Sequence, residues 1–199
     1  LKLKTPIFIL LCALFIIAMI SIINIVNFMD GIDGLVMGSM VIPFIVLIIS
    51  FDMYFLSPFI GSMLAFLVLN WPPAKIFMGD TGSTYIGAIF VGVLLLLPSI
   101  YDIIKVLFII LPLLADTSLC LIYRFFKGKN IFEAHKLHLY QRLYQAGMSK
   151  SKVTSIYVFS TSLLGILYFS DNDLIFITVM FLILLTGFFL NKNHAVKLN

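Results

Sequence analysis

The sequence has few charged residues. Only 11% of its 199 residues are Asp, Glu, Lys or Arg, whereas roughly 25% is usual in a soluble domain. Hydrophobic residues make up 62% of the chain, and the mean hydropathy is +1.15. This composition excludes a soluble globular domain and predicts an integral membrane protein.

Cysteine is also scarce. Cys12 and Cys120 both lie in apolar stretches, where a thiol packs like any small hydrophobic group, so they provide neither a disulfide framework nor a metal-binding spacing. The basic residues form no stripe with nucleic-acid motifs, which excludes a role in binding DNA or RNA. We attribute the pI of 9.1 to membrane topology and to contacts with anionic lipids.

Long apolar runs are abundant. A helix needs about 20 apolar residues to cross the hydrocarbon core, where lipid offers no partner to an unpaired backbone group. We therefore expect an all-α, polytopic helical bundle in a lipid bilayer, with about seven transmembrane helices in a single domain that spans residues 1–199. The runs cover residues 6–26, 35–51, 53–70, 83–100, 103–123, 153–170 and 173–190.

Basic residues orient this bundle. Residues 124–152 contain seven Lys or Arg and one acidic residue, so this loop is expected in the cytoplasm. Alternation of the spans then places the loops at about 24–34 and 70–83 on the same face. Lys105 falls on the opposite face, against the rule.

The three loops on this face contain the components of a metal and phosphate site. The first, NIVNFMDGIDG, carries Asp30 and Asp33, and the second, NWPPAKIFMGDTGS, carries Asn70 and Asp80. Mg²⁺ binds one or two carboxylates together with phosphate oxygens and water. The third loop contains EAHKLHLYQRL, residues 133–143, whose basic side chains can neutralise phosphate.

Each of these features also has a purely structural interpretation. Asp-Gly is ordinary turn chemistry, Asp80 is an alternative helix cap, and Asn70 can simply end a helix before two prolines. Lys136 and Arg142 are alternatively determinants of topology only. The histidines, His135 and His138, are alternatively solvated interfacial residues. Asp116, deeper in the fifth run, is either a structural polar contact near Thr117 or Ser118 or a catalytic group.

Together, the motifs NFMDGIDGL at 27–35, FMGDTGS at 77–83 and HKLHLYQRL at 135–143 resemble the polyprenyl-phosphate N-acetylhexosamine-1-phosphate transferases, glycosyltransferase family 4. The resemblance covers nearly the whole chain in the family's order. It implies a multi-pass enzyme of the bacterial inner membrane with a cytoplasmic active face. Such an enzyme transfers N-acetylhexosamine 1-phosphate from a UDP-sugar to undecaprenyl phosphate, releasing UMP, with Mg²⁺ or alternatively Mn²⁺. A homodimer is one option for its assembly.

The resemblance also implies roles for individual residues. Asp80 is implied to be the metal ligand, and Asp30, Asp33 and His138 are implied to act with it in catalysis. The remaining implied residues bind the substrates: Asn27, Asn70, His135, Lys136 and Arg142.

The sequence departs from the family in two places. It contains no adjacent Asp pair, although the family carries one in its N-terminal half, so we expect a C-terminal portion of the transferase fold that does not catalyse transfer alone. The third motif lacks the consecutive histidines of the muramoyl-pentapeptide transferases and is more similar to enzymes that initiate surface polysaccharides. Two alternatives stay open: a transporter or channel, and an inactive membrane subunit derived from the same fold.

Overall fold

The computed structural model describes residues 5–130, 136–170 and 172–197, and this part of the chain contains helices and no strands. The expected all-α membrane bundle is therefore confirmed. The elements are α1 Thr5–Phe28, α2 Leu35–Phe51, the 3₁₀ turn η1 Tyr54–Leu56, α3 Ser57–Asn70, α4 Gly79–Leu94, α5 Ile100–Leu107, the 3₁₀ turn η2 Phe108–Ile110, α6 Leu111–Phe126, α7 Leu139–Gln145, α8 Lys150–Tyr168 and α9 Asp173–Asn193.

Each of the seven predicted apolar runs corresponds to a helical segment. Three of these segments are long and apolar enough to cross a membrane: residues 6–28, 100–126 and 173–193. Two shorter apolar helical stretches cover residues 35–51 and 54–70. The helices α1 and α9 expose most of their apolar side chains, as helices that face lipid do.

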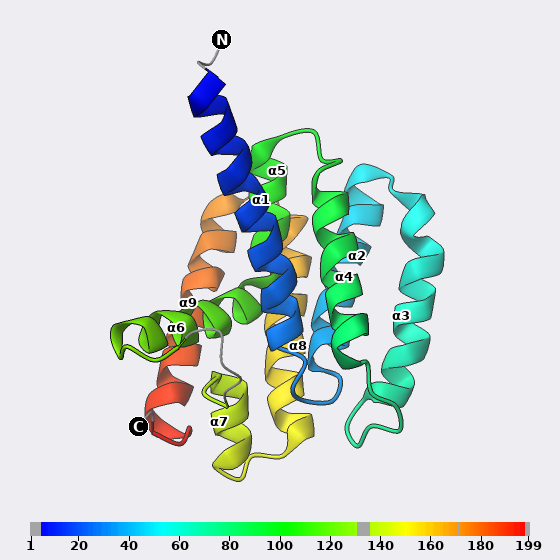
Figure 1. Cartoon of the computed structure of the whole chain (residues 1–199). Coiled ribbons are helices and arrows are strands. Elements are labelled where there is room, and N and C mark those ends of the chain that lie inside the picture. The colour runs from blue at the N-terminus through cyan, green and yellow to red at the C-terminus, as the bar shows by residue number, and fades with distance from the viewer. Residues whose placement is uncertain (1–4, 131–135, 171, 198–199) are drawn as a thin grey trace.

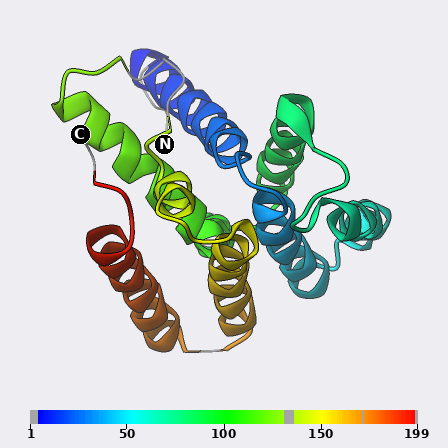
Figure 2. The ribbon, with the colours of Figure 1, turned by 90° about the horizontal axis from the view of Figure 1, so that it is seen from below.

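Helix α2 occupies the centre of the bundle. Most of its side chains are buried, and it packs against α3 on one side and α8 on the other, while α1 packs against α4 (Figures 1 and 2). Its start is fixed by Gly34, whose φ of 73° lies in the left-handed region that favours glycine. This position ends the polar loop after α1 and turns the chain into the core.

The helical segment 100–126, which contains the fifth apolar run 103–123, bends within that run. The chain forms α5, passes through η2, and continues as α6, which lies across the neighbouring helices (Figure 1). Pro112 lies in the first turn of α6, where its missing N–H is tolerated. The bend brings the end of α6 towards α7 and α9.

Lys105, the exception to the positive-inside rule, lies at the end of the bundle opposite the polar loops, as expected, and has a local explanation. Its ammonium group lies 2.9 Å from the Asp173 carboxylate and over the ring of Tyr168, at 5.2 Å from the centroid. The opposite charge and the aromatic ring compensate the lysine. The pair joins α5 to the first turn of α9 at the end of the bundle opposite the predicted site.

Candidate active site

The three polar loops meet at one end of the bundle, the lower end in Figure 1. The loop between α1 and α2 carries Asp30 and Asp33 in a turn rather than on a helix face. The Asp33 carboxylate accepts a hydrogen bond from the Ala74 backbone N–H at 3.3 Å. It also lies 3.2 Å from the Lys150 ammonium group at the start of α8. Asp33 therefore joins the first loop to the second loop and to α8.

Two asparagines connect the first and second loops. The buried Asn70 side chain accepts a hydrogen bond from the Gly34 N–H at 2.9 Å and donates to the Ile76 carbonyl at 2.9 Å. Asn27 donates to the Ser83 hydroxyl at 2.9 Å. These contacts give both asparagines a structural role, and their substrate-binding role stays a prediction.

Asp80 lies at the start of α4. It is in the first turn, but the N-cap position is Met78, which makes no side-chain cap bond, so the helix-cap alternative for Asp80 is wrong. The hydroxyl of Ser83 donates to the carbonyls of Gly79 and Asp80 and likewise does not cap the helix. The Asp80 residue is exposed, which leaves its carboxylate accessible to solvent and to a ligand.

Asp30 has the most strongly perturbed acidic group of this region. Its burial raises its pKa from 3.8 to about 7, and the negative charges of Asp80 and Asp33 add to this effect. Three carboxylates from two separate motifs thus act on one another at this end of the bundle. A cation bound there would relieve their repulsion.

This donor set fits a hard divalent cation. Across residues 5–130, 136–170 and 172–197, no three His, Cys, Asp or Glu side chains form a ready metal cluster. Mg²⁺ does not require one, because it commonly takes one or two carboxylates and completes its shell with substrate phosphates and water. The exposed Asp80, with Asp30 charged above pH 7, provides such a pair.

The third loop contributes a buried histidine. His138 is 3% exposed and occupies the N-cap position of α7. The His138 backbone N–H donates a hydrogen bond to the Gln141 side-chain oxygen at 3.3 Å. The imidazole stacks on Tyr140, with ring centroids 5.7 Å apart, and lies beside Phe28 at 6.4 Å. The interfacial, purely solvated alternative for this histidine is therefore wrong.

Arg142 is buried and bonded to protein groups. Its guanidinium group donates to the carbonyls of Leu137 and Val196, at 3.0 and 2.9 Å, and to the Asn191 side chain. These bonds attach α7 to the end of α9 and the residues that follow it. Lys136 is exposed. His135 lies outside the described residues.

Two residues that hold the parts of the site together, Lys150 and Tyr140, were not predicted as site residues from the sequence. Lys150 was counted only as a topology determinant, yet it pairs with Asp33. Tyr140 donates to the Phe28 carbonyl at 3.1 Å, and a Cβ at Gly31 would clash with its hydroxyl. Tyr140 lies within the third motif and Gly31 within the first. Their places in these motifs were the sequence feature that could have indicated a contact between the two loops.

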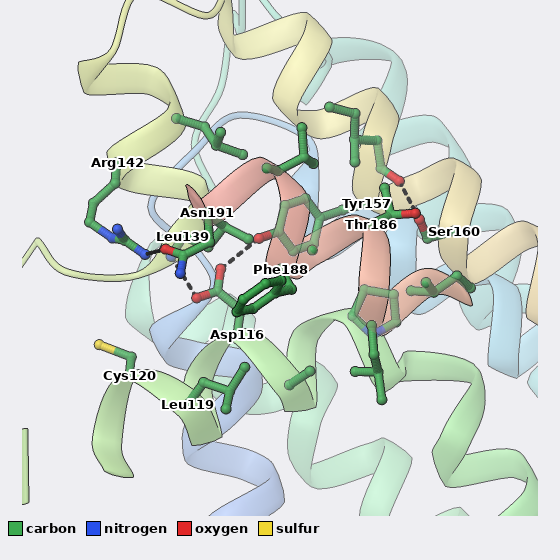
Figure 3. A pocket seen from close by; sticks show the side chains of 18 of the residues that line it. Asp116, Leu119, Cys120, Leu139, Arg142, Tyr157, Ser160, Thr186, Phe188 and Asn191 are labelled. Carbon is green, nitrogen blue, oxygen red and sulfur yellow. Dashed lines mark hydrogen bonds between the residues drawn. The ribbon is translucent and has the colours of Figure 1, made fainter. Parts of the chain in front are cut away.

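A cavity of about 650 Å³ lies behind this region, between α6, α7, α8 and α9. Its wall is mostly apolar and includes Leu119 and Phe188, while Asp116, Arg142 and Asn191 contribute polar groups (Figure 3). Asp116 thus lies between this cavity and α7.

Comparison with known proteins identifies relatives of the N-terminal half. Residues 1–98 match the family described as Glycosyl transferase family 4. A probable undecaprenyl-phosphate N-acetylglucosaminyl 1-phosphate transferase of Bacillus subtilis (strain 168) is 36% identical over 106 residues, which is 50% of this chain and 29% of the relative.

Phospho-N-acetylmuramoyl-pentapeptide-transferases are similar to the same extent. The protein from Clostridium perfringens (strain 13 / Type A) is 37% identical over 101 residues, 49% of this chain and 30% of the relative. That from Thermotoga maritima is 37% identical over 98 residues, 48% of this chain and 31% of the relative. The chain thus spans about a third of the length of the curated relatives it matches. The matches cover about half of the chain, less than the resemblance suggested, and the family match includes Asp30, Asp33, Asn70 and Asp80.

Proposed function

From the match of residues 1–98 to glycosyl transferase family 4, we propose that this chain contributes the nucleotide-sugar and metal site of a membrane transferase. The donor is a UDP-N-acetylhexosamine and the acceptor is undecaprenyl phosphate. The reaction yields undecaprenyl-diphospho-sugar and UMP, the first step of a surface polysaccharide or cell-wall glycan. It takes place at the cytoplasmic face of a bacterial inner membrane.

The observation that carries this proposal is the convergence of Asp30, Asp33 and Asp80. Asp30 and Asp33 lie 50 and 47 positions before Asp80 along the chain, and burial, together with the charges of Asp80 and Asp33, raises the pKa of Asp30. Such a cluster at a membrane end suits a substrate that brings its own metal and phosphates.

The reaction requires two anions to approach each other. An oxygen of the lipid phosphate attacks the β-phosphorus of the donor, and the bond from that phosphorus to the bridging oxygen of UMP breaks. Bound Mg²⁺, or Mn²⁺ in its place, would neutralise the diphosphate charge. Asp80, with Asp30 beside it, would hold that ion, while the Asp33–Lys150 pair keeps the acidic loop in place. His138 faces the end of α1 next to this loop, where it can orient a phosphate oxygen.

Direct binding tests the donor site without requiring turnover. The protein in detergent is titrated with UDP-N-acetylglucosamine by calorimetry, with Mg²⁺ and with EDTA. We expect saturable binding that EDTA abolishes. The absence of Mg²⁺-dependent binding to any of a panel of UDP-N-acetylhexosamines would contradict the proposal.

Because we expect the chain alone not to catalyse transfer, transfer is tested in membranes that contain the protein together with a family segment that carries the adjacent Asp pair, which this chain lacks. We expect UMP release from the UDP-sugar that depends on added undecaprenyl phosphate and on Mg²⁺. Binding without UMP release would favour the inactive-subunit alternative. Cation uptake by proteoliposomes would favour the transporter alternative, which relied on Asp116 as a group within the membrane.

A further inference from the structure

We propose that Asp116 is the positioning residue for His138: it fixes the start of α7 and thereby the placement of the imidazole at the transfer site. The proposal rests on the function proposed above. It gives a role to a buried carboxylate that belongs to none of the three motifs.

The Asp116 carboxylate is enclosed by protein donors. The residue is 6% exposed. One carboxylate oxygen accepts the Leu139 N–H at 2.6 Å, and the other accepts the Tyr140 N–H at 3.1 Å and the Tyr157 hydroxyl at 2.6 Å. Figure 3 shows the Leu139 and Tyr157 bonds converging on it from α7 and α8. The sequence-based alternative of a contact with Thr117 or Ser118 is therefore replaced by contacts with two other helices.

The two backbone donors are those at the start of α7. The first N–H groups of a helix have no partner within it, and α7 begins at Leu139. Asp116 thus supplies from another helix the acceptor that a local cap usually provides. In return, the two N–H groups and Tyr157 compensate a buried charge that would otherwise be costly.

This bond pair determines where His138 points. The histidine immediately precedes Leu139, and its Nδ1 lies 3.6 Å from an Asp116 carboxylate oxygen. The backbone after His138 is held by Asp116, and its ring is stacked on Tyr140, whose own N–H is held by the same carboxylate. Asp116 therefore restrains the imidazole through the following backbone and through the adjacent ring.

An apolar residue at position 116 would leave the Leu139 and Tyr140 N–H groups without this acceptor, and each buried group left unsatisfied destabilises the fold. A carboxylate, by contrast, can hold two successive N–H groups in a fixed geometry. Small displacements of a reacting group cost much more in rate than in folding, so a precise anchor next to His138 has a functional reason.

Hydrogen exchange tests the anchor without substrate. Asp116→Asn keeps the shape of the side chain but replaces one acceptor oxygen with a donor. We expect amide exchange in a peptide covering 138–145 to be faster in this variant than in the parent protein in detergent. Tyr157→Phe is the matched control, because it removes the third donor to Asp116 and leaves both bonds to α7. Equal exchange in Asp116→Asn and the parent overturns the proposal.

A double-mutant cycle tests the link to His138. Loss of a group that orients a functional residue typically costs about 10- to 100-fold, and we expect Asp116→Asn to lower the rate of UMP release by this amount with KM for the UDP-sugar nearly unchanged. Combined with His138→Ala, it should add no further loss, whereas a merely structural role would give independent losses. Additive losses overturn the proposal. If the parent protein, supplied with the family segment that carries the adjacent Asp pair, releases no UMP, the proposed function is overturned, and the exchange result then shows separately whether the anchor has failed.

Discussion

Asn70 provides the sharpest test of how the first two motifs are held together. In Asn70→Ala, the buried Gly34 N–H and the Ile76 carbonyl both lose their partner. Each lost bond removes about 0.5–1.5 kcal/mol, and a buried group left unsatisfied costs about 1–3 kcal/mol, so we expect a total loss of about 2–4 kcal/mol. For a chain of this size that corresponds to a melting temperature lower by about 5–15 °C.

The chain contains a natural reporter for this measurement. Trp71, its single tryptophan, adjoins Asn70, so thermal melting in detergent can be followed by its fluorescence. Asn172→Ala is the control, because Asn172 is an exposed cap that accepts one bond, from the Ile175 N–H at 3.2 Å. Its loss should cost about 1 kcal/mol. Equal melting of Asn70→Ala and Asn172→Ala would refute the structural role that we assign to Asn70.

Three further predictions concern the acidic loop and the third motif. Asp80→Asn should melt within about 2 °C of the parent, since surface changes alter stability by about 0.5 kcal/mol or less, and should lose Mg²⁺-dependent UDP-sugar binding in calorimetry; retained binding would remove Asp80 from the metal site. His138→Ala should slow UMP release more than Lys136→Ala at equal amounts of folded protein, because Lys136 is exposed, and the reverse order would contradict our assignment. Finally, the folded protein keeps a proton on Asp30 between pH 4 and 7 that the unfolded chain has lost, so the contribution of Asp30 to stability falls as pH rises through this window. Melting temperatures of Asp30→Asn should therefore vary less with pH than those of the parent, and parallel profiles would show that Asp30 is not the group responsible.

The apolar pattern predicted the helices well but not their breaks. Residues 35–51 are helical as expected, because Gly34 and Asp52, both with positive φ, terminate the pattern at each end. Hydropathy shows how apolar a segment is but not how its axis runs in space. It therefore could not predict the change of direction at 108–110. Proline did not resolve the ambiguity either, since Pro43 lies inside α2 while Pro112 lies at the start of α6.

The site was predictable in its location more than in its contacts. Charge asymmetry and alternation of spans predicted that the three polar loops share one end, and the structure brings them together. Which polar side chains are bonded to other protein groups depends on which distant segments the fold brings together. Asn70 and Arg142 are held by backbone carbonyls, and Asp33 by Lys150, 117 positions away. A single sequence contains no spacing rule for such pairs.

The contact between Gly31 and Tyr140 has an evolutionary consequence. The tyrosine hydroxyl lies too close to the place that a Cβ at position 31 would take and bonds to the Phe28 carbonyl, so a side chain at position 31 would displace the Tyr140 hydroxyl. Homologous chains with a side chain at the first position should carry a residue smaller than tyrosine at the second. The order in which the smaller residue at position 140 comes first avoids the displacement of the tyrosine hydroxyl within the loop.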